Sequence, residues 1–590
     1  MTATPWGFRD ILPEEAQARE DIALAVRACF KRRGYLPVET PLLEDKGSLE
    51  EGGRIVDTPF KLFDDDGGLL VVRPDNTLPI VRMVSTRLTT GDLPLRLRYE
   101  APVVRDQPRY AARSRQFTQL GFELIGAGDT AGDVEVVTLV MDALRALGLA
   151  GSRIVCGSVR PFRELLAVCG DDALAAEALG LVHANDFVDL DDRVAESSAT
   201  PAAKRAICEL PRLHGGAEVL DRVDELLADA GVKGSATSEL RALLAGVVEA
   251  DAAGKDNATA PAAPAATPAP VPLSFDFSLM NSFDYYTGLV LKAYAGNLPD
   301  AVGSGGRYDS IFDGKLGQGI SVPAAGFAFS LERLEGARDA AQDESAAGDF
   351  AAIRSAQEPL RIAVPKGSLK EGTLASLEAV GLDVSGLRDP GRHLIIRASE
   401  RTDAPNPYAS HAIGDVEFVI VRPTDAPAFV ACGGADCGIC GRDSLIEAGL
   451  GLLQLVDLGF GTCRFIEAEP RANKGKAERA YARRGSLRVA TKYPRIASAW
   501  YQSRGVNADI VSLHGNIELG PIVGMTDRIV DITATGTTLR ENDLVITGEI
   551  MTCTARFFVN PGRARLDARV RELADRLAAW RVASAEDDRH

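Results

Sequence analysis

The chain has 590 residues, 46% of them hydrophobic and 25% charged, which is the composition of a globular protein and not of a disordered or fibrous one. This length suits about three or four domains. The formal net charge of −17 repels a phosphate backbone and disfavours bulk nucleic-acid binding. The N-terminus lacks the apolar core of a signal peptide, and no stretch reaches the roughly 18 apolar residues of a membrane span. We therefore expect a cytoplasmic protein without a membrane partner.

The first part of the chain predicts an α+β fold. Apolar residues recur at helical spacing between residues 14 and 33 and stop before Gly34, which indicates a helix with a glycine just past its end. Residues 93–126 form two β-type runs around an arginine-rich turn, as in an antiparallel hairpin. Helical spacing returns at residues 134–147.

Two polar stretches predict connectors. Residues 252–272 are rich in alanine and proline, which indicates a low-complexity surface insertion because this composition buries little apolar surface. Residues 336–359 are polar and rich in small residues, and they predict a linker. The expected domains are therefore residues 1–335 and 360–582.

The second part predicts an α/β fold. Short apolar strands alternate there with helices, each strand being followed by a polar turn. The predicted strands are residues 361–364, 416–421, 487–491, 509–513 and 528–532. This alternation indicates βα units around mostly parallel sheets, in which ligands bind beyond the carboxyl ends of the strands.

The strongest local motif is RIVDITATGTTLREN, residues 528–542, in which an apolar strand runs into a small, hydroxyl-rich turn that opens a helix. Backbone N–H groups, threonine hydroxyls and the positive helix end suit a phosphate. Asp531 at the base of the turn suits ribose hydroxyls or Mg²⁺. The alternative is a capped turn without a ligand. The turn residues are Ala534, Thr535, Gly536, Thr537 and Thr538.

Seven segments in residues 360–560 together resemble the short-form ATP phosphoribosyltransferase family. They are LRIAVPKGSL, VIVRPTDAPAFV, GADCGICGRDSLIE, DLGFGTCR, RVATKYP, LHGNIELGP and DRIVDITATGTTLREN. The resemblance implies two α/β lobes of periplasmic-binding-protein type with the active site in the cleft. It also implies transfer of phosphoribosyl from phosphoribosyl pyrophosphate to N1 of ATP, the first step of histidine biosynthesis. Mg²⁺ would arrive with the substrates, and no protein-only metal site is expected.

The same resemblance assigns roles to individual residues. Asp531 and the turn would hold the ribose and the 5-phosphate, and Lys366, Gly367 and Arg422 would meet phosphates. Asp443 and Glu518 would contact nucleotide or ribose. Taken one at a time, these residues have other interpretations: Lys366 as a solvated lysine, Arg422 as a partner in a surface ion pair, and Glu518 as an acid that begins a helix. The expected catalytic residues are Lys366, Arg422, Asp443, Glu518 and Asp531, and the expected ATP contacts are Lys366, Gly367, Arg422, Asp443 and Glu518.

Four cysteines, Cys432, Cys437, Cys440 and Cys463, match the spacing of a plant-type iron–sulfur site. However, Cys437 and Cys440 lie where the phosphoribosyltransferase pattern has an apolar and a small residue. Side-chain alternation along a strand would also divide the set between two faces. We therefore expect buried thiols and no metal cluster.

Residues 4–335 resemble the catalytic core of histidyl-tRNA synthetase, and still more its non-aminoacylating paralogue, the regulatory subunit of short phosphoribosyltransferases. The matching segments are YLPVETPLLED, VVRPDNTLPIVR, VVRDQPRYAARSRQFTQLGFELIG, FDYYTG, GSGGRYD and AAGFAFSLER. The resemblance implies a class II antiparallel sheet with flanking helices. Because this fold is normally dimeric, a homo-oligomer is expected.

The departures from the synthetase pattern concern its ATP chemistry. Gln107 stands where the second motif has a glutamate, and Asn281 replaces an arginine that assists amino-acid activation. The amino-acid pocket is better preserved, and its carboxylates and tyrosines suit an ammonium and an imidazole. The pocket could instead persist as a polar network that supports the fold. Its expected residues are Asp75, Thr77, Arg105, Gln119, Glu123, Tyr285 and Tyr286.

The sequence thus favours an ATP phosphoribosyltransferase that is inhibited by histidine through its N-terminal half. One alternative is a class II aminoacyl-tRNA synthetase with an accessory domain, which Gln107 and Asn281 disfavour. The other is a two-lobed small-ligand binding protein, which would have no use for the phosphoribosyl turn.

Overall fold

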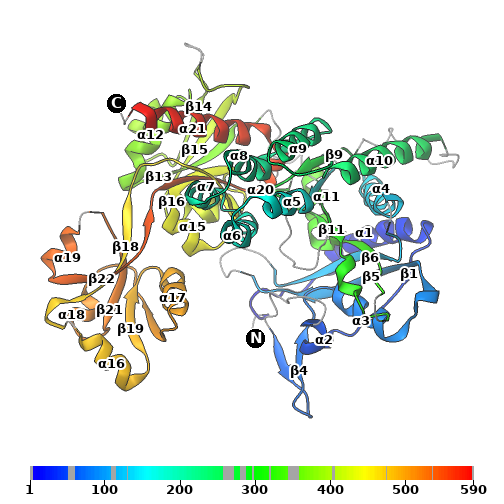
Figure 1. Ribbon diagram of the computed structural model, residues 1–590, viewed down its shortest axis with the longest axis horizontal. Coiled ribbons are helices and arrows are strands. Elements are labelled where there is room, and N and C mark those ends of the chain that lie inside the picture. The colour runs from blue at the N-terminus through cyan, green and yellow to red at the C-terminus, as the bar shows by residue number, and fades with distance from the viewer. Residues whose placement is uncertain are drawn as a thin grey trace. The chain divides into compact units, whose positions relative to one another are not determined.

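The computed structural model divides into two compact units, Met1–Gln357 and Glu358–His590, which are described separately (Figure 1). Among the described residues, no helix is long and apolar enough to span a bilayer. The structure describes residues 4–50, 60–107, 114–128, 130–149, 151–256, 271–279, 288–295, 298–317, 320–342, 358–401, 406–473, 475–534 and 536–587.

The first unit is built on a nine-stranded sheet in the order β1-β5-β6-β12-β11-β10-β7-β9-β8. The predicted hairpin is confirmed, since β5 and β6 pair antiparallel over their whole lengths. A smaller sheet has the order β2-β4-β3. The strands are β1 (Leu36–Pro37), β2 (Leu43–Asp45), β3 (Lys61–Phe63), β4 (Leu69–Val72), β5 (Leu95–Val104), β6 (Gln116–Ile125), β7 (Arg153–Ser158), β8 (His214–Gly215), β9 (Leu273–Asp276), β10 (Leu289–Tyr294), β11 (Gly303–Arg307) and β12 (Ala324–Ser330).

Three helices cover the central strands of this sheet. The predicted first helix is confirmed as α1 (Pro13–Arg32), which packs against α4 (Thr130–Ala146) and α11 (Leu331–Gln342). In turn, α11 packs on β6 and α4 on β12. The apolar stripe of α1 is buried, as its helical spacing predicts. Two further helices are α2 (Lys46–Glu50) and α3 (Thr77–Arg87).

A group of six helices lies between β7 and β9 in the chain and was not predicted from the sequence. The last of them, α10, continues to Asp256, so the predicted insertion begins at least five residues too early. Similarly, α11 continues to Gln342, into the predicted linker. Both stretches are rich in alanine, which favours a helix even where little apolar surface is buried. The helices are α5 (Arg160–Val168), α6 (Asp172–His183), α7 (Phe187–Glu196), α8 (Pro201–Glu209), α9 (Glu218–Asp229) and α10 (Ser238–Asp256).

The second unit contains two sheets, of six and five strands. The first has the order β14-β15-β13-β16-β23-β17, and the second has the order β20-β19-β21-β18-β22. The strands are β13 (Leu360–Pro365), β14 (Ile395–Ser399), β15 (Asp415–Val421), β16 (Cys437–Gly441), β17 (Leu453–Asp457), β18 (Cys463–Pro470), β19 (Leu487–Thr491), β20 (Ala508–Ser512), β21 (Arg528–Thr533), β22 (Leu544–Cys553) and β23 (Ala555–Val559).

The prediction of mostly parallel sheets is wrong. The expected βα units are parallel, namely β13 with β15 and β16, and β19 with β20 and β21. However, β14, β18, β22 and β23 pair antiparallel with their neighbours. Several of these strands pair with partners distant in the chain, as β18 does with β22 and β16 with β23, and the local alternation of strands and helices does not specify the direction of such pairs. The helices of this unit are α12 (Lys370–Ala379), α13 (Ser385–Arg388), α14 (Ala426–Ala431), α15 (Arg442–Ala448), α16 (Lys476–Arg484), α17 (Pro494–Ser503), α18 (Leu519–Ile522), α19 (Thr537–Glu541), α20 (Pro561–Leu566) and α21 (Ala568–Asp587).

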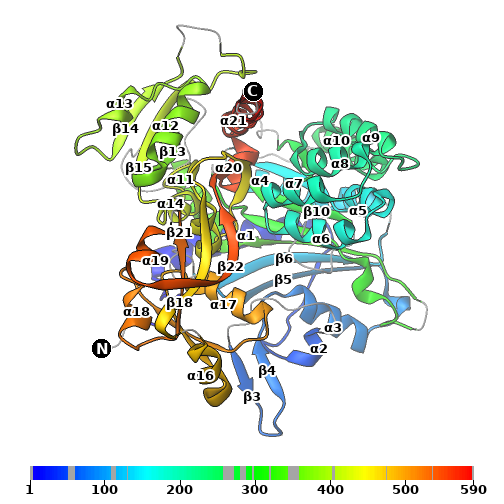
Figure 2. The same ribbon diagram turned by 60° about the vertical axis from the view of Figure 1, so that its left-hand side comes forward.

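Two adjacent chain segments connect the sheets of the second unit. The chain passes from β17 in the first sheet to β18 in the second, and it returns from β22 to β23. The backbone N–H of Ala555 donates to the carbonyl of Phe460 at 2.9 Å, so the two connections lie side by side. Figures 1 and 2 show β18 and β22 running together along the second unit.

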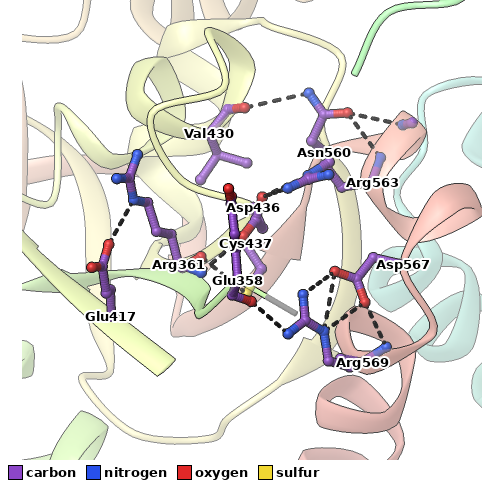
Figure 3. Close-up of polar contacts among 11 residues, drawn as sticks. Glu358, Arg361, Glu417, Val430, Asp436, Cys437, Asn560, Arg563, Asp567 and Arg569 are labelled. Carbon is purple, nitrogen blue, oxygen red and sulfur yellow. Dashed lines mark hydrogen bonds and ion pairs between the residues drawn. The ribbon is translucent and has the colours of Figure 1, made fainter. Parts of the chain in front are cut away.

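A buried ion pair links the first strand of this unit, β13, with helix α20 (Figure 3). Asp436 accepts a hydrogen bond from Arg563 Nε at 2.6 Å and one from the backbone N–H of Arg361 at 2.8 Å. Both charged side chains are about 5% exposed. Asn560 caps α20 and donates to the carbonyl of Val430. Because a buried charge that loses its partner is strongly destabilising, this contact holds β13 and α20 in place.

Replacing Asp436 with Asn should lower the free energy of unfolding of the second unit by about 3 kcal/mol or more, because Arg563 would keep a buried, unpaired charge. The measurement is urea unfolding followed by tryptophan fluorescence in a Trp6→Phe background, in which Trp500 and Trp580 report on this unit. Glu549→Gln is the control, since its partner Arg464 and Glu549 itself are about half exposed. Equal losses in both variants would contradict this account.

Candidate active site and amino-acid pocket

Three loops of the second unit lie at one edge of its first sheet. Because β15, β13 and β16 are adjacent and parallel, the residues that follow them share the carboxyl edge of the sheet. Lys366 follows β13, Arg422 follows β15 and Asp443 follows β16. Lys366 and Arg422 are exposed, whereas Asp443 is 8% exposed.

The second sheet presents a corresponding edge. Its parallel strands β20, β19 and β21 are followed by Glu518, by Lys492 and Tyr493, and by the hydroxyl-rich turn. Glu518 is the N-cap residue of α18, and Asp531 lies in β21.

The two edges meet at Asp443. Burial raises the pKa of Asp443 above its ordinary value, and the nearby Tyr493 side chain acts in the opposite direction. Burial and the nearby carboxylates of Asp443 and Asp531 raise the pKa of Tyr493 as well. Beside this contact, Glu447 of α15 accepts hydrogen bonds from the backbone N–H groups of Arg495 and Ile496, which begin α17. The structure therefore brings Asp443 and Asp531 into one electrostatic environment.

Asp531 is the most perturbed carboxylate of this site. Burial, with a further contribution from Glu518, raises its pKa to about 6, whereas a hydrogen bond from the N–H of Ile532 and the charge of Lys492 act in the opposite direction. Perturbed carboxylates that share a site indicate a functional role. Asp531, Glu518 and Lys492 thus lie within electrostatic reach of one another.

The hydroxyl-rich turn after β21 leads into helix α19. Gly536 has a φ of 69°, a left-handed value that favours glycine, and its N–H donates to Thr533 Oγ1 at 2.9 Å. Thr537 and Thr538 are exposed. The helix that follows, α19, has only five residues, so N–H groups and hydroxyls matter here more than a long helix dipole. Thr535 lies outside the described residues.

Lys366 and Gly367 line a cavity of about 430 Å³. Lys370, Arg392 and His393 add cationic or polar side chains to its wall, and Leu374 and Leu387 add apolar surface. Arg422 follows the adjacent strand. Sequence reasoning missed Arg392 and His393, which belong to no motif. It also gave no role to Lys492 and Tyr493, although the matching segment RVATKYP contains both.

In the first unit, Glu123 is the centre of a buried polar cluster. It is 1% exposed and accepts hydrogen bonds from Thr77 Oγ1 at 2.9 Å, from the Tyr99 hydroxyl at 3.1 Å and from the Tyr308 hydroxyl. Burial raises the pKa of Glu123 to about 7, and Asp75 adds to this effect, while the three hydroxyl groups oppose it. The strand register places Glu123 beside Gly326, where a Cβ atom would collide with its carboxylate.

The other predicted pocket residues lie around this cluster. Asp75 accepts from the N–H of Leu78 and lies in the field of Arg105, while burial raises its pKa. Gln119 Oε1 accepts from both nitrogen atoms of Asn76. Arg105 Nε donates to the carbonyl of Pro74 at 2.8 Å. Tyr285 and Tyr286 lie outside the described residues. Tyr99, Tyr308 and Asn76 were not predicted, although the matching segments GSGGRYD and VVRPDNTLPIVR contain Tyr308 and Asn76.

Comparison with known proteins gives matches to both units. The family model described as histidyl-tRNA synthetase matches residues 7–334, and the one described as ATP phosphoribosyltransferase matches residues 422–579. An ATP phosphoribosyltransferase of Rubrobacter xylanophilus is 47% identical over 207 residues, 35% of this chain and 89% of the relative. The chain belongs to the ATP phosphoribosyltransferase family.

The two units correspond to two separate proteins in Moorella thermoacetica. Its ATP phosphoribosyltransferase is 44% identical over 212 residues, 36% of this chain and 87% of that protein. Its ATP phosphoribosyltransferase regulatory subunit is 36% identical over 354 residues, 59% of this chain and 84% of that protein. The chain is therefore a fusion of a regulatory-subunit unit with a catalytic-subunit unit, and the hypothesis of a mere small-ligand binding protein is rejected.

The four cysteines with iron–sulfur spacing occupy different surroundings. Cys432 is exposed at the end of α14, while Cys437 and Cys440 are buried in β16. Cys440 belongs to the apolar core beside α14 and α15, and the Cys437 thiol faces the carbonyl of Arg361. Cys463 begins β18 in the second sheet. Within the described part of the chain, no group of three or more His, Cys, Asp or Glu residues is placed to hold a metal ion.

The pKa of Glu123 predicts a pH-dependent stability of the first unit. Since the folded state raises this pKa from 4.5 to about 7, the proton stabilises folding fully below about 4.5. That contribution, at most about 3 kcal/mol, is lost as pH rises through about 7. Compared with Glu123→Gln, the wild type should therefore lose free energy of unfolding between about pH 5 and about pH 8. Urea unfolding followed by Trp6 fluorescence, with Trp500 and Trp580 replaced by Phe, measures this loss.

Glu135→Gln is the matched control. Although burial acts to raise its pKa, hydrogen bonds from Arg96 and Tyr35 lower the pKa of Glu135 below its ordinary value. A lowered pKa gives stability that is lost only as pH falls through the acid range, so Glu135→Gln, which keeps Glu123, should lose as much free energy of unfolding between about pH 5 and about pH 8 as the wild type does. A parallel pH dependence in Glu123→Gln and the wild type would refute the assignment.

Proposed function

We propose that the chain transfers the phosphoribosyl group of phosphoribosyl pyrophosphate to N1 of ATP, releases pyrophosphate and is inhibited by histidine through its first unit. The observation that carries this proposal is the meeting of two sheet edges at Asp443 and Tyr493, with Asp531, Glu518 and the hydroxyl-rich turn on the opposite edge. In this proposal, each of the two sheet edges binds one of the two substrates. Family membership supports the same activity.

In this proposal, the turn that contains Gly536 and Thr537 holds the 5-phosphate, and Asp531 accepts hydrogen bonds from ribose hydroxyls. Lys366 and Arg422 supply positive charge to phosphates, and Asp443 and Glu518 contact nucleotide or ribose. The reaction needs adenine N1 to be held against the anomeric carbon while that carbon develops oxocarbenium character. Carboxylates near the ribose stabilise this positive charge, and the cationic side chains stabilise the departing pyrophosphate. No covalent nucleophile is needed.

Mg²⁺ fits the oxygen donors of this site. It is usually held by one or two carboxylates together with substrate phosphates, and Asp531 and Glu518 offer such carboxylates beside the turn. When bound, it would neutralise charge on the leaving pyrophosphate.

For the first unit, we infer that the cluster around Glu123 binds histidine. Carboxylates at Glu123 and Asp75 suit the ammonium group, and the aromatic and amide groups around them suit the imidazole. The class II resemblance also implies that the chain forms homo-oligomers. For the second unit, the two sheets fit a two-lobed fold of periplasmic-binding-protein type.

The assay of this proposal mixes the purified protein with ATP, phosphoribosyl pyrophosphate and Mg²⁺ and follows the absorbance of the N1-alkylated product. Gly536→Pro combined with Thr537→Ala should lower kcat/KM for phosphoribosyl pyrophosphate by about a hundredfold or more. The reason is the loss of bonds to a charged phosphate, each worth about 1.5–3 kcal/mol. Thr86→Ala, an exposed threonine of the first unit, is the control. Near-normal kinetics in the double variant would overturn the phosphate site.

Histidine should inhibit the wild type, and Glu123→Gln should raise its inhibition constant about tenfold or more without changing the uninhibited rate, because a charged hydrogen bond is worth about 1.5–3 kcal/mol. Glu135→Gln should leave inhibition unchanged, since Glu135 is paired with Arg96 outside the cluster. Calorimetric titration with histidine measures binding separately. Unchanged inhibition in Glu123→Gln would refute the pocket, and charging of tRNA would instead support the synthetase alternative.

A further inference from the structure

Cys463 and Cys553 lie opposite each other on adjacent strands of the second sheet of the catalytic unit. They are paired residues in the antiparallel ladder of β18 and β22, with Cα atoms directly opposite in register. Side chains at such positions have Cβ atoms about 4.5–5.5 Å apart, close to the separation that a disulfide spans. The two thiols are close enough for each to shift the pKa of the other, and both are free thiols.

The pair lies where the chain crosses between the sheets. Cys463 is the first residue of β18, a few residues after β17 of the first sheet, and Cys553 is the last residue of β22, immediately before β23. The hydrogen bond between Ala555 and Phe460 shows that the two crossing segments are adjacent here. A covalent bond between the thiols would therefore join both connections between the sheets at their exit from the second sheet.

The pair also lies beside the proposed transfer site. Both thiols are in the electrostatic field of Asp443, and Cys463 acts on Tyr493 in the same way. Both cysteines belong to the apolar cluster that contains Tyr493. A change of geometry at this pair would therefore reach the contact between Asp443 and Tyr493.

The two thiols differ in accessibility and acidity. Cys463 is half-buried, whereas Cys553 is 1% exposed. The interaction between the two thiols lowers the pKa of Cys463, whereas this interaction together with burial raises the pKa of Cys553. Since the thiolate is the reactive form, Cys463 is the thiol that an external reagent would meet first.

We propose that Cys463 and Cys553 form a reversible dithiol–disulfide switch that changes the rate of phosphoribosyl transfer by fixing the two connections between the sheets. The oxidant is a small disulfide. The Cys463 thiolate attacks one of its sulfur atoms, so an S–S bond breaks, a mixed disulfide forms and one small thiolate leaves. Cys553 then loses its proton to that thiolate and attacks Cys463 Sγ, which releases the second small thiolate. Two protein thiols are oxidised and one small disulfide is reduced.

The effect on activity rests on the proposed function, whereas formation of the disulfide does not. In this proposal, the two sheets change their relative position as substrates bind and products leave, and hinge residues commonly lie at element ends such as these. A cross-link between both connections restricts that change.

The test treats the reduced, full-length protein with glutathione disulfide under native conditions, alkylates the remaining thiols and digests the protein with trypsin. Cleavage at arginine leaves Cys463 in the peptide 443–464 and Cys553 in the peptide 541–556, with no other cysteine in either. The two peptides should be found joined in the wild type and in Cys432→Ser, the control that removes an exposed thiol of the same unit. In Cys553→Ser, Cys463 should carry a glutathione adduct instead. In Cys463→Ser, Cys553 should remain unmodified.

Absence of the joined peptides in the native wild type, or their formation only in urea, would overturn the pairing whether or not the protein has transfer activity. Turnover is then compared before and after oxidation for each variant. Oxidation should lower turnover of the wild type and of Cys432→Ser by about tenfold, and a reductant should restore it. The ratio of turnover after oxidation to turnover before it should stay near one in Cys463→Ser. A fully formed disulfide that leaves turnover and KM unchanged would overturn the switch.

Discussion

The electrostatic interaction between Tyr493 and Asp443 is the constraint that links the two sheets of the catalytic unit. Asp443 comes from the carboxyl edge of the first sheet and Tyr493 from that of the second. Removing a carboxylate from water is costly, and Asp443 is stabilised by the Ser444 hydroxyl at 3.4 Å and by Tyr493 at the edge of the other sheet. The arrangement therefore makes the relative position of the sheets part of the site.

The first unit uses buried polar groups in a different way. Glu123 is held by three hydroxyl groups, from α3, β5 and the residue after β11, so its surroundings are fixed by the sheet and not by loops. Burial keeps its pKa near 7 in spite of these donors. A ligand with a positive charge would favour the ionised carboxylate, which gives the pocket a physical reason to prefer an ammonium group.

The sequence predicted those features that depend on local spacing. The helix α1, the hairpin of β5 and β6, and the parallel βα units follow from apolar periodicity and turn residues, which act over a few neighbours. The antiparallel pairing of β18, β22 and β23 could not be predicted in this way, because their partners are far apart in the chain. Tyr493 was missed for the same reason, because its role depends on an interaction with Asp443, which follows a strand of the other sheet and lies far away in the chain.

The fusion of the two units has a thermodynamic consequence. A tether keeps a regulatory and a catalytic unit at a fixed ratio and at a high effective concentration, so regulation does not require assembly from dilute subunits. Coupling still requires an element with two arrangements that the ligand favours unequally, and it is typically worth about 1–3 kcal/mol. Within the catalytic unit, the two connections between the sheets are suited to this role, since a small change in their geometry alters the distance between Asp443 and Asp531. An inhibitor that stabilises one sheet arrangement could then lower the rate without touching either substrate.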